Sequence, residues 1–138
     1  MITSVHALIY SDDVDATRTF LRDVIGFPFV NDTGTPDDSA TGWLIFGTGP
    51  SELGVHPTRS EWQGKVWEAP RHVEISFMCD DVAATRAELE AKGATFQGDI
   101  ADEGWGLVTV MDVPGTDGIN LYQPRHEVAY ALGGAPEP

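Results

Sequence analysis

The amino-acid sequence predicts an α+β fold built from two βαβββ units related by a pseudo-twofold axis. Residues 5–21 and 73–89 align without a gap and share eight identical residues in seventeen positions. Each copy carries an Asp-Asp pair between an apolar run and a helix-like segment, and three short apolar runs follow it. The offset of 68 residues is about half of the 138-residue chain. This indicates one duplicated supersecondary unit rather than a solenoid, which needs three or more short repeats.

Each predicted unit begins with a strand that leads into a helix. The apolar runs 5–10 and 73–79 have the length and composition of short strands. Asp12-Asp13 and Asp80-Asp81 follow them, and their carboxylates suit both an N-cap position and the positive end of a helix dipole. We therefore expect a helix to start directly after each pair.

The rest of each unit is predicted to be three strands. The helices should end near Ile25 and Lys92, because Gly26 and Gly93 stand where a left-handed C-cap residue belongs. Strand candidates separated by Gly, Pro and Asp then follow. They are Phe27–Val30, Trp43–Phe46 and Glu52–His56 in the first unit, and Thr95–Gln97, Gly106–Met111 and Ile119–Gln123 in the second.

The domain organisation follows from the repeat. We expect one domain over residues 1–125, with units at about 1–58 and 71–125. The segment 59–70 is polar, shows no strand pattern and is interpreted as a linker. Residues 126–138 are interpreted as a C-terminal tail that ends in a low-complexity stretch.

Composition narrows the possible partners. With 8 basic and 22 acidic residues the formal net charge is −14, which opposes binding to nucleic acid or to anionic membranes and favours cations. A single cysteine, Cys79, rules out an internal disulfide and lies in an apolar run typical of the core. The amino terminus lacks a signal-like pattern, and no apolar run approaches the length of a membrane span. We therefore expect a cytoplasmic protein.

The chain resembles the vicinal oxygen chelate superfamily of glyoxalases, bleomycin resistance proteins and extradiol dioxygenases. The residues that carry the resemblance are His6 with Asp13 seven positions later, Glu74 with Asp81 seven positions later, the helix end at 24–27, and the closing segment 113–124. The resemblance covers about residues 1–125 and implies mixed or antiparallel sheets that curl into a cleft. Because this fold hosts isomerases, dioxygenases, transferases and plain binders, it defines the fold better than the function.

The same resemblance implies a metal site. In the family, metal ligands lie on the first and last strands of each unit, and these positions fall here on His6 and Glu74. The last strand of the second unit presents Asn120 where the family usually has a glutamate. Either Glu52 or His56 could complete the set from the first unit. A set of His6, His56 and Glu74 would suit a divalent Zn, Ni, Fe or Mn ion, and no organic cofactor is expected.

Other side chains allow more than one interpretation. Glu52 and Glu74 are candidates for proton transfer, and His6 and His56 are alternatively hydrogen-bonded cleft histidines without a metal. His72 shares the face of Glu74 by period two and ranks lower. We assign His126, beyond the last strand, to the surface tail.

Aromatic residues supply the predicted substrate pocket. Trp62 and Trp67 lie in the polar linker and must pack on something, whether a cleft, a dimer contact or the core between the halves. The full predicted pocket is Trp43, Trp62, Trp67, Trp105, Asn120 and Tyr122. Aromatic walls of this kind suit planar or apolar ligands.

Three functional hypotheses follow. The first is a glyoxalase-like enzyme, a metal-assisted lyase or isomerase that acts on a small oxygenated substrate. The second is a metal-free binding protein that sequesters a cationic, partly aromatic compound, as bleomycin resistance proteins do. A dioxygenase is the weakest of the three. In each case we expect a small-molecule ligand and a homodimer.

Overall fold

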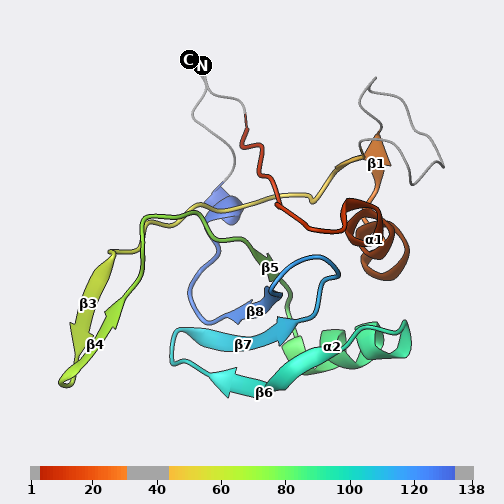
Figure 1. Ribbon diagram of the computed structural model, residues 1–138. Coiled ribbons are helices and arrows are strands. Elements are labelled where there is room, and N and C mark those ends of the chain that lie inside the picture. The colour runs from red at the N-terminus through yellow and green to blue at the C-terminus, as the bar shows by residue number, and fades with distance from the viewer. Residues whose placement is uncertain (1–3, 31–43, 133–138) are drawn as a thin grey trace.

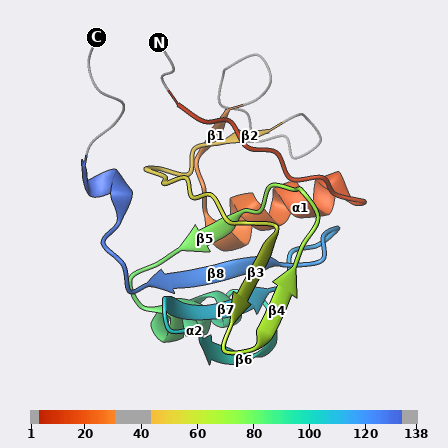
Figure 2. The ribbon, with the colours of Figure 1, turned by 90° about the vertical axis from the view of Figure 1, so that its left-hand side faces the viewer.

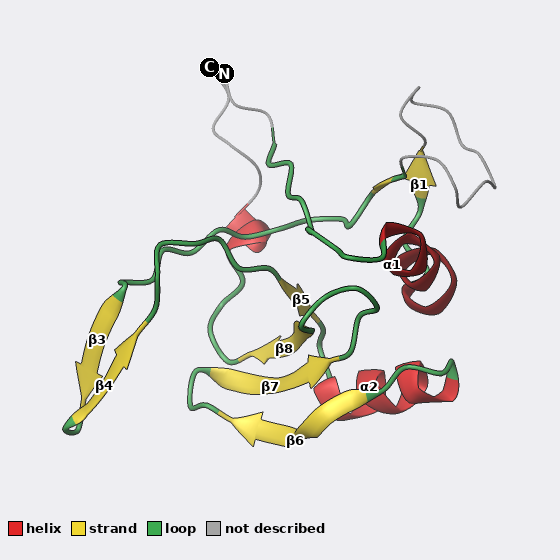
Figure 3. Ribbon diagram, in the orientation of Figure 1, coloured by secondary structure: helices red, strands yellow, loops and turns green. Residues whose placement is uncertain are grey.

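The computed structural model describes residues 4–30 and 44–132 and has an α+β architecture with mixed sheets (Figures 1 and 3). Its main sheet has four strands in the order β5-β8-β7-β6. β5 runs parallel to β8, and the other neighbours are antiparallel. The elements are α1 (Val14–Phe20), η1 (Leu21–Ile25), β1 (Phe29–Val30), β2 (Ile45–Phe46), β3 (Arg59–Trp62), β4 (Lys65–Glu68), β5 (Ser76–Met78), α2 (Val82–Ala91), β6 (Phe96–Asp102), β7 (Gly106–Met111), β8 (Ile119–Pro124) and η2 (Ala129–Leu132).

Both helices begin and end where the sequence predicts. The carboxylates of Asp13 and Asp81 accept hydrogen bonds from backbone N–H groups three residues ahead, at 3.1 and 3.0 Å. At the other end, Gly26 (φ 83°) and Gly93 (φ 98°) adopt the left-handed conformation. α1 reaches Gly26 through η1, which is one turn of π-helix. Within 4–30 and 44–132, no helix is long and apolar enough to cross a membrane.

The second unit forms the complete βαβββ order. β7 has the predicted bounds, and β8 extends the predicted strand by one residue, to Pro124. β6 is longer than predicted because its pairing with β7 continues to Asp102, across an irregularity between Gln97 and Ala101. A shift in register breaks the alternation of apolar and polar residues along the strand, so a prediction based on strict alternation ends the strand too early.

The first unit departs from the prediction. Neither 5–10 nor 52–56 forms a strand, and only the two-residue strands β1 and β2 pair with each other. Apolar side chains in these segments face solvent, including Tyr10 (88 % exposed) and Val55 (97 % exposed). A strand exists only when a neighbour accepts its backbone hydrogen bonds. These two segments have the composition of strands, but among the described residues no other strand pairs with them.

The predicted linker 59–70 contains a β-hairpin, so its interpretation as patternless was wrong. β3 and β4 pair in a four-residue register around a two-residue turn, Gln63-Gly64. Both turn residues have positive φ, 50° and 77°, as hairpin turns of the primed types require. Figures 1 and 2 together show this hairpin on the opposite side of the four-stranded sheet from α2.

The core lies between the helices and one face of the main sheet. Met111 is fully buried there, and Cys79 packs against the same cluster as predicted, half-buried. Burial of the Cys79 thiol raises its pKa. The buried members are Phe20, Leu21, Val82, Leu89, Ala94, Met111, Val113, Ile119 and Leu121.

A seam joins α1 to the turn between β7 and β8. The hydroxyl of Thr17 lies 2.5 Å from the carbonyl oxygen of Pro114 and 2.6 Å from the hydroxyl of Ser11. The backbone N–H of Asp12 donates to the carbonyl of Gly115 at 3.0 Å. Gly115 has φ 82°, and a Cβ there would collide with the hydroxyl of Ser11 and lie 2.8 Å from the backbone nitrogen of Asp13. Only glycine fits this approach.

We predict that Gly115→Ala lowers the free energy of unfolding by roughly 2–5 kcal/mol. About 1–2 kcal/mol comes from the left-handed backbone, and about 1–3 kcal/mol comes from overpacking. Gly26→Ala is the matched control, because Gly26 has φ 83° but a Cβ added there would meet no atom within 4 Å. Urea denaturation of both variants measures the difference, and equal losses would show that the seam contact adds nothing.

Candidate functional site

The helix α2 packs against β7 and β8 on one face of the four-stranded sheet, and the opposite face carries several of the predicted site residues. Alternation along β8 buries Ile119 and Leu121 against α2 and turns Asn120 and Tyr122 to the other side. On β7, Val108 and Val110 pair with Tyr122 and Asn120. We call this side the open face. Its strand residues are Ser76, Met78, Val108, Val110, Asn120 and Tyr122.

A carboxylate and an amide meet at one end of the open face. The side-chain amide of Asn120 donates to Oε1 of Glu74 at 3.2 Å. Nε2 of His72 lies 3.6 Å from Oε2 of the same carboxylate, and its Nδ1 lies 2.7 Å from the carbonyl of Pro70. The Pro70 carbonyl and then Glu74 raise the pKa of His72 above its ordinary value. The position where the family usually has a glutamate is thus occupied by a hydrogen-bond donor to Glu74.

Aromatic rings and a second carboxylate gather at the other end of β8. Tyr122 packs edge-to-face on Trp105, with ring centroids 5.2 Å apart, and its ring centroid lies 5.9 Å from that of His126. Glu52 accepts from the backbone N–H of Ala129 at 2.9 Å and lies 3.4 Å from Nε2 of His126. Desolvation and then the Glu52 charge raise the pKa of Tyr122. We call Glu52, Trp105, Tyr122 and His126 the aromatic cluster.

Gly106 makes room for the Tyr122 ring. It stands two residues before Val108 on β7 and therefore on the open face. A Cβ at Gly106 would collide with the Tyr122 ring and lie 2.7 Å from the carbonyl of Gln123. The missing side chain lets the ring lie across the end of β7 toward Trp105.

An ion pair anchors the segment after β8. The guanidinium of Arg125 donates to both carboxylate oxygens of Asp102, at 2.5 and 2.7 Å, in a bidentate geometry. The backbone N–H of Arg125 also donates to the carbonyl of Trp105 at 3.0 Å. Arg125, helped by the backbone N–H of Gly104, lowers the pKa of Asp102 to about 2. The pair positions His126 beside Tyr122.

The three predicted metal ligands are not brought together. His6 is exposed on the amino-terminal segment, and the Nδ1 of His56 lies 2.7 Å from the carbonyl of Pro57. In the described part of the chain, no group of three or more His, Cys, Asp or Glu side chains could hold a metal ion. With Glu74 bonded to an amide instead of facing a second carboxylate, the donor set as placed does not fit a divalent metal.

The four tryptophans lie in different parts of the molecule. Trp105 joins the aromatic cluster. Trp62 (69 % exposed) and Trp67 (44 % exposed) lie on the hairpin and do not close the core between the halves, which was one of the alternatives. Trp43 lies outside the described residues. Of the predicted pocket residues, Trp105 and Tyr122 contact each other, and Asn120 lies on the same face of β8 as Tyr122.

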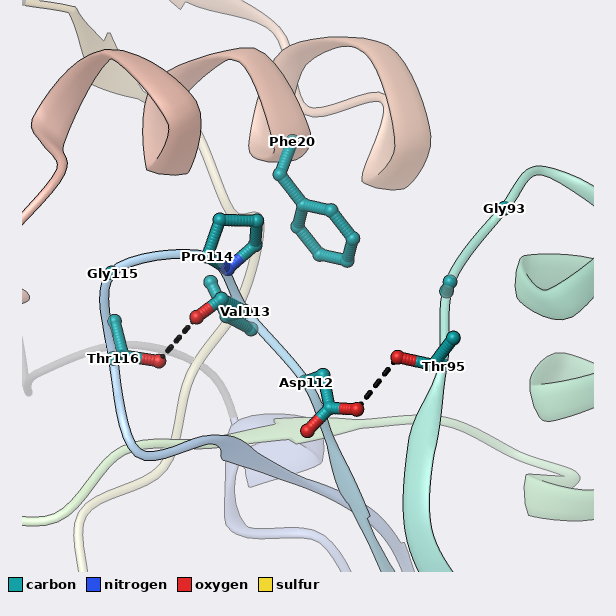
Figure 4. Close-up of a pocket in the computed structure, with 9 residues that line it drawn as sticks. Phe20, Gly93, Thr95, Asp112, Val113, Pro114, Gly115 and Thr116 are labelled. Atoms are coloured by element: carbon teal, nitrogen blue, oxygen red, sulfur yellow. Dashed lines mark hydrogen bonds between the residues drawn. The ribbon is translucent and has the colours of Figure 1, made fainter.

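A pocket of about 320 Å³ lies elsewhere, between α1, the end of α2 and the β7–β8 turn (Figure 4). It is lined by Phe20, Asp112 and Pro114 among others, and by none of the predicted site residues. The Asp112 carboxylate already accepts from Thr95 at 2.6 Å and from Gln97 at 2.9 Å. The Asp112 carboxylate in this pocket is thus already hydrogen-bonded to neighbouring residues. We therefore place the candidate site on the open face.

Sequence reasoning missed two members of the site. His126 was assigned to a surface tail, but its ring and Nε2 contact Tyr122 and Glu52. Arg125 was not singled out, although it forms the bidentate pair. Their position in the sequence could have indicated this role. They directly follow the predicted last strand, where the chain leaves the sheet beside Tyr122.

The fold belongs to a known class. A family model described as the Glyoxalase/Bleomycin resistance protein/Dioxygenase superfamily matches residues 3–121. The chain therefore belongs to this superfamily, as the sequence motifs indicated.

Individual relatives are distant. No curated protein matches the chain. Among solved structures, lactoylglutathione lyase from Agrobacterium tumefaciens is 19 % identical, with 83 % of this chain and 87 % of that chain covered and a TM-score of 0.47. TnmS3, an antibiotic binding protein from Streptomyces sp. CB03234, is also 19 % identical, with coverages of 90 % and 99 % and a TM-score of 0.49.

We predict that Arg125→Gln raises the pKa of Asp102 from about 2 part of the way toward 3.8, with the Gly104 N–H retaining the rest of the shift. A depressed acid pKa stabilises the fold above the unfolded pKa, and that stability is lost as pH falls through the folded pKa. The stability advantage of the wild type should therefore vanish between about pH 4 and pH 2. Carboxyl NMR titration measures the pKa, with Arg71→Gln as a control of equal charge. An unchanged Asp102 titration would contradict the assigned cause.

Proposed function

We propose that this protein binds a small cationic, partly aromatic compound on the open face without a metal ion. The observation that carries the proposal is the hydrogen bond from the Asn120 amide to the Glu74 carboxylate. Two facing carboxylates would favour a divalent cation, whereas one carboxylate oriented by an amide favours an organic monocation. Sequestration of such a compound is the second of the three hypotheses raised by the sequence.

The rest of the open face supports an aromatic ligand. Val108 and Val110 form an apolar floor beside Glu74, and Tyr122 with Trp105 forms an aromatic wall at the other end. A planar cation can stack on such rings while its charge meets the carboxylate. The net charge of −14 adds a long-range attraction for cations.

The metal-assisted lyase or isomerase is supported by family membership. No cluster of three or more His, Cys, Asp or Glu side chains in the described ranges supports it over binding. The dioxygenase hypothesis rests on the same membership. A homodimer and a cytoplasmic location remain proposals.

We predict that Glu74→Gln weakens binding of ethidium, a planar aromatic cation, by up to about fivefold. A solvent-exposed ion pair contributes up to about 1 kcal/mol, and about 1.4 kcal/mol corresponds to a factor of ten. Fluorescence titration at low salt measures the dissociation constant. The anionic dye anilinonaphthalene sulfonate should bind less tightly than ethidium to the wild type.

The matched control is Glu88→Gln, which removes the same charge from the exposed surface of α2. Equal losses in the two variants would mean that only the net charge of the protein matters, and would contradict a binding site at Glu74.

Elemental analysis of protein purified without chelator, followed by melting with EDTA, tests the enzyme hypothesis. A stoichiometric transition metal whose removal lowers the melting temperature would overturn the metal-free proposal.

We also predict that ethidium affinity rises with pH across the titration of His72. The pKa of His72 is raised above 6.5, so His72 is charged below that pKa and competes with the ligand for Glu74. Above the pKa the neutral imidazole releases the carboxylate. Titrations between about pH 6 and pH 9 measure the trend, and His72→Gln should flatten it. An unchanged slope in this variant would show that another group is responsible.

A further inference from the structure

The side chains around the pocket between α1, the end of α2 and the β7–β8 turn accept hydrogen bonds rather than donate them. Three of its nine lining residues have polar side chains, namely Thr95, Asp112 and Thr116. The Thr95 hydroxyl donates to the Asp112 carboxylate at 2.6 Å, and the Thr116 hydroxyl donates to the carbonyl of Val113 at 2.8 Å. Both hydroxyl hydrogens are thus used inside the wall, whereas the Thr95 oxygen keeps lone pairs that can accept.

Backbone N–H groups of the same wall are also engaged. Those of Gly93 and Ala94 donate to carbonyls in the last turn of α2, both at 3.0 Å. Those of Asp112 and Thr116 donate to neighbouring carbonyls, at 2.9 and 3.1 Å. A ligand that donates hydrogen bonds therefore matches this wall, whereas one that only accepts them would leave its polar groups unpaired.

Asp112 gives the pocket a negative charge that its hydrogen-bond partners do not cancel. The carboxylate is bound by the Thr95 hydroxyl and, at 2.9 Å, by the Gln97 amide, and both donors are neutral. Thr95 and then Gln97 lower the pKa of Asp112, so the group is ionised at neutral pH. A carboxylate can accept about four hydrogen bonds, which leaves room for a ligand. Lys92, the basic residue next to this wall in sequence, is not among the residues that line the pocket.

The end of α2 and an aromatic ring complete the pocket. Gly93 and Ala94 line it directly after α2, and the negative end of a helix dipole favours a cation. Figure 4 shows the Phe20 ring pointing from α1 into the space between Val113 and Gly93. Such a ring can pack on an apolar or aromatic group, or on the cation itself. The pocket thus combines a negative wall with an aromatic one.

A second cavity, of about 410 Å³, adjoins the first along α1 and shares two lining residues with it. It also contains carboxylates, Asp15 and Asp23, but each has an arginine beside it. Asp15 lies 3.7 Å from Arg18, and Asp23 lies 2.7 Å from Arg22. Because these charges are paired, the first pocket is the better place for a cationic ligand.

We propose that the pocket at Asp112 binds a small organic ammonium ion that carries an apolar or aromatic group. The ammonium donates to the Asp112 carboxylate and to the Thr95 oxygen, while the apolar group packs on Phe20. A volume of about 320 Å³ is at the lower end for ligand pockets, so the ligand is small. None of the lining residues belongs to the open face. This second site is therefore independent of the proposed function.

Benzylammonium is the probe, titrated into the full chain and followed by NMR of the backbone amides. We expect saturable shifts at Gly93, Ala94 and Thr116, and a higher melting temperature because the ligand binds the folded chain. Asp112→Asn keeps the size of the side chain and removes its charge, so it should weaken binding by up to about fivefold. Benzyl alcohol, the neutral counterpart of the probe, should bind the wild type more weakly by a similar factor.

The matched control is Asp99→Asn, which removes an exposed carboxylate from β6 outside the pocket and should leave the affinity unchanged. Thr95→Lys is a second variant, which attaches an ammonium group to the chain beside Asp112. It should abolish benzylammonium binding. This variant tests the site even if Asp112→Asn does not fold.

Absence of saturable binding would overturn the proposal, and so would shifts confined to the open face. Equal weakening in Asp112→Asn and Asp99→Asn would overturn it as well, because only net charge would then matter. Glu74→Gln separates this site from the proposed function and should leave benzylammonium binding intact. If ethidium fails to bind while benzylammonium still shifts the pocket amides, the proposed function is rejected and this second site stands.

Discussion

The contact between the start of α1 and the β7–β8 turn holds the two units together. The Thr17 hydroxyl reaches the carbonyl of Pro114 across 97 positions of sequence and is almost fully buried. Because Gly115 has no side chain, the backbone around Asp13 can approach the turn closely. This approach brings Phe20 into one core with the residues of the second unit. Without it, the first unit would have little to pack against, since its own predicted sheet is hardly formed.

Burial of one side of the main sheet determines where chemistry can occur. The core on the helix side takes every second residue of β7 and β8, so Asn120 and Tyr122 must face away from it. Glu74 and Glu52 then approach this face from segments outside the sheet, each held by a specific donor. The site is thus a consequence of the strand register together with two long-range hydrogen bonds.

Three carboxylates at or beside the candidate site are each held by a specific donor. Asp102 is bound by Arg125, Glu74 by Asn120, and Glu52 by the backbone of Ala129. The Asn120 amide and the Ala129 backbone are uncharged donors that do not cancel the charge of Glu74 and Glu52, whereas the Arg125 guanidinium balances that of Asp102.

The sequence by itself determined the helices, their caps, the βαβββ order of the second unit and the superfamily, and it singled out Glu74 and Asn120 as site candidates. Caps and alternation depend on residues a few positions apart, so they can be read locally. Only the tertiary structure decided that 5–10 and 52–56 form no strand, that 59–68 forms a hairpin, and that His126 joins Tyr122 and Glu52. Whether a segment pairs depends on which backbone groups reach it from distant parts of the chain, and no local pattern records that.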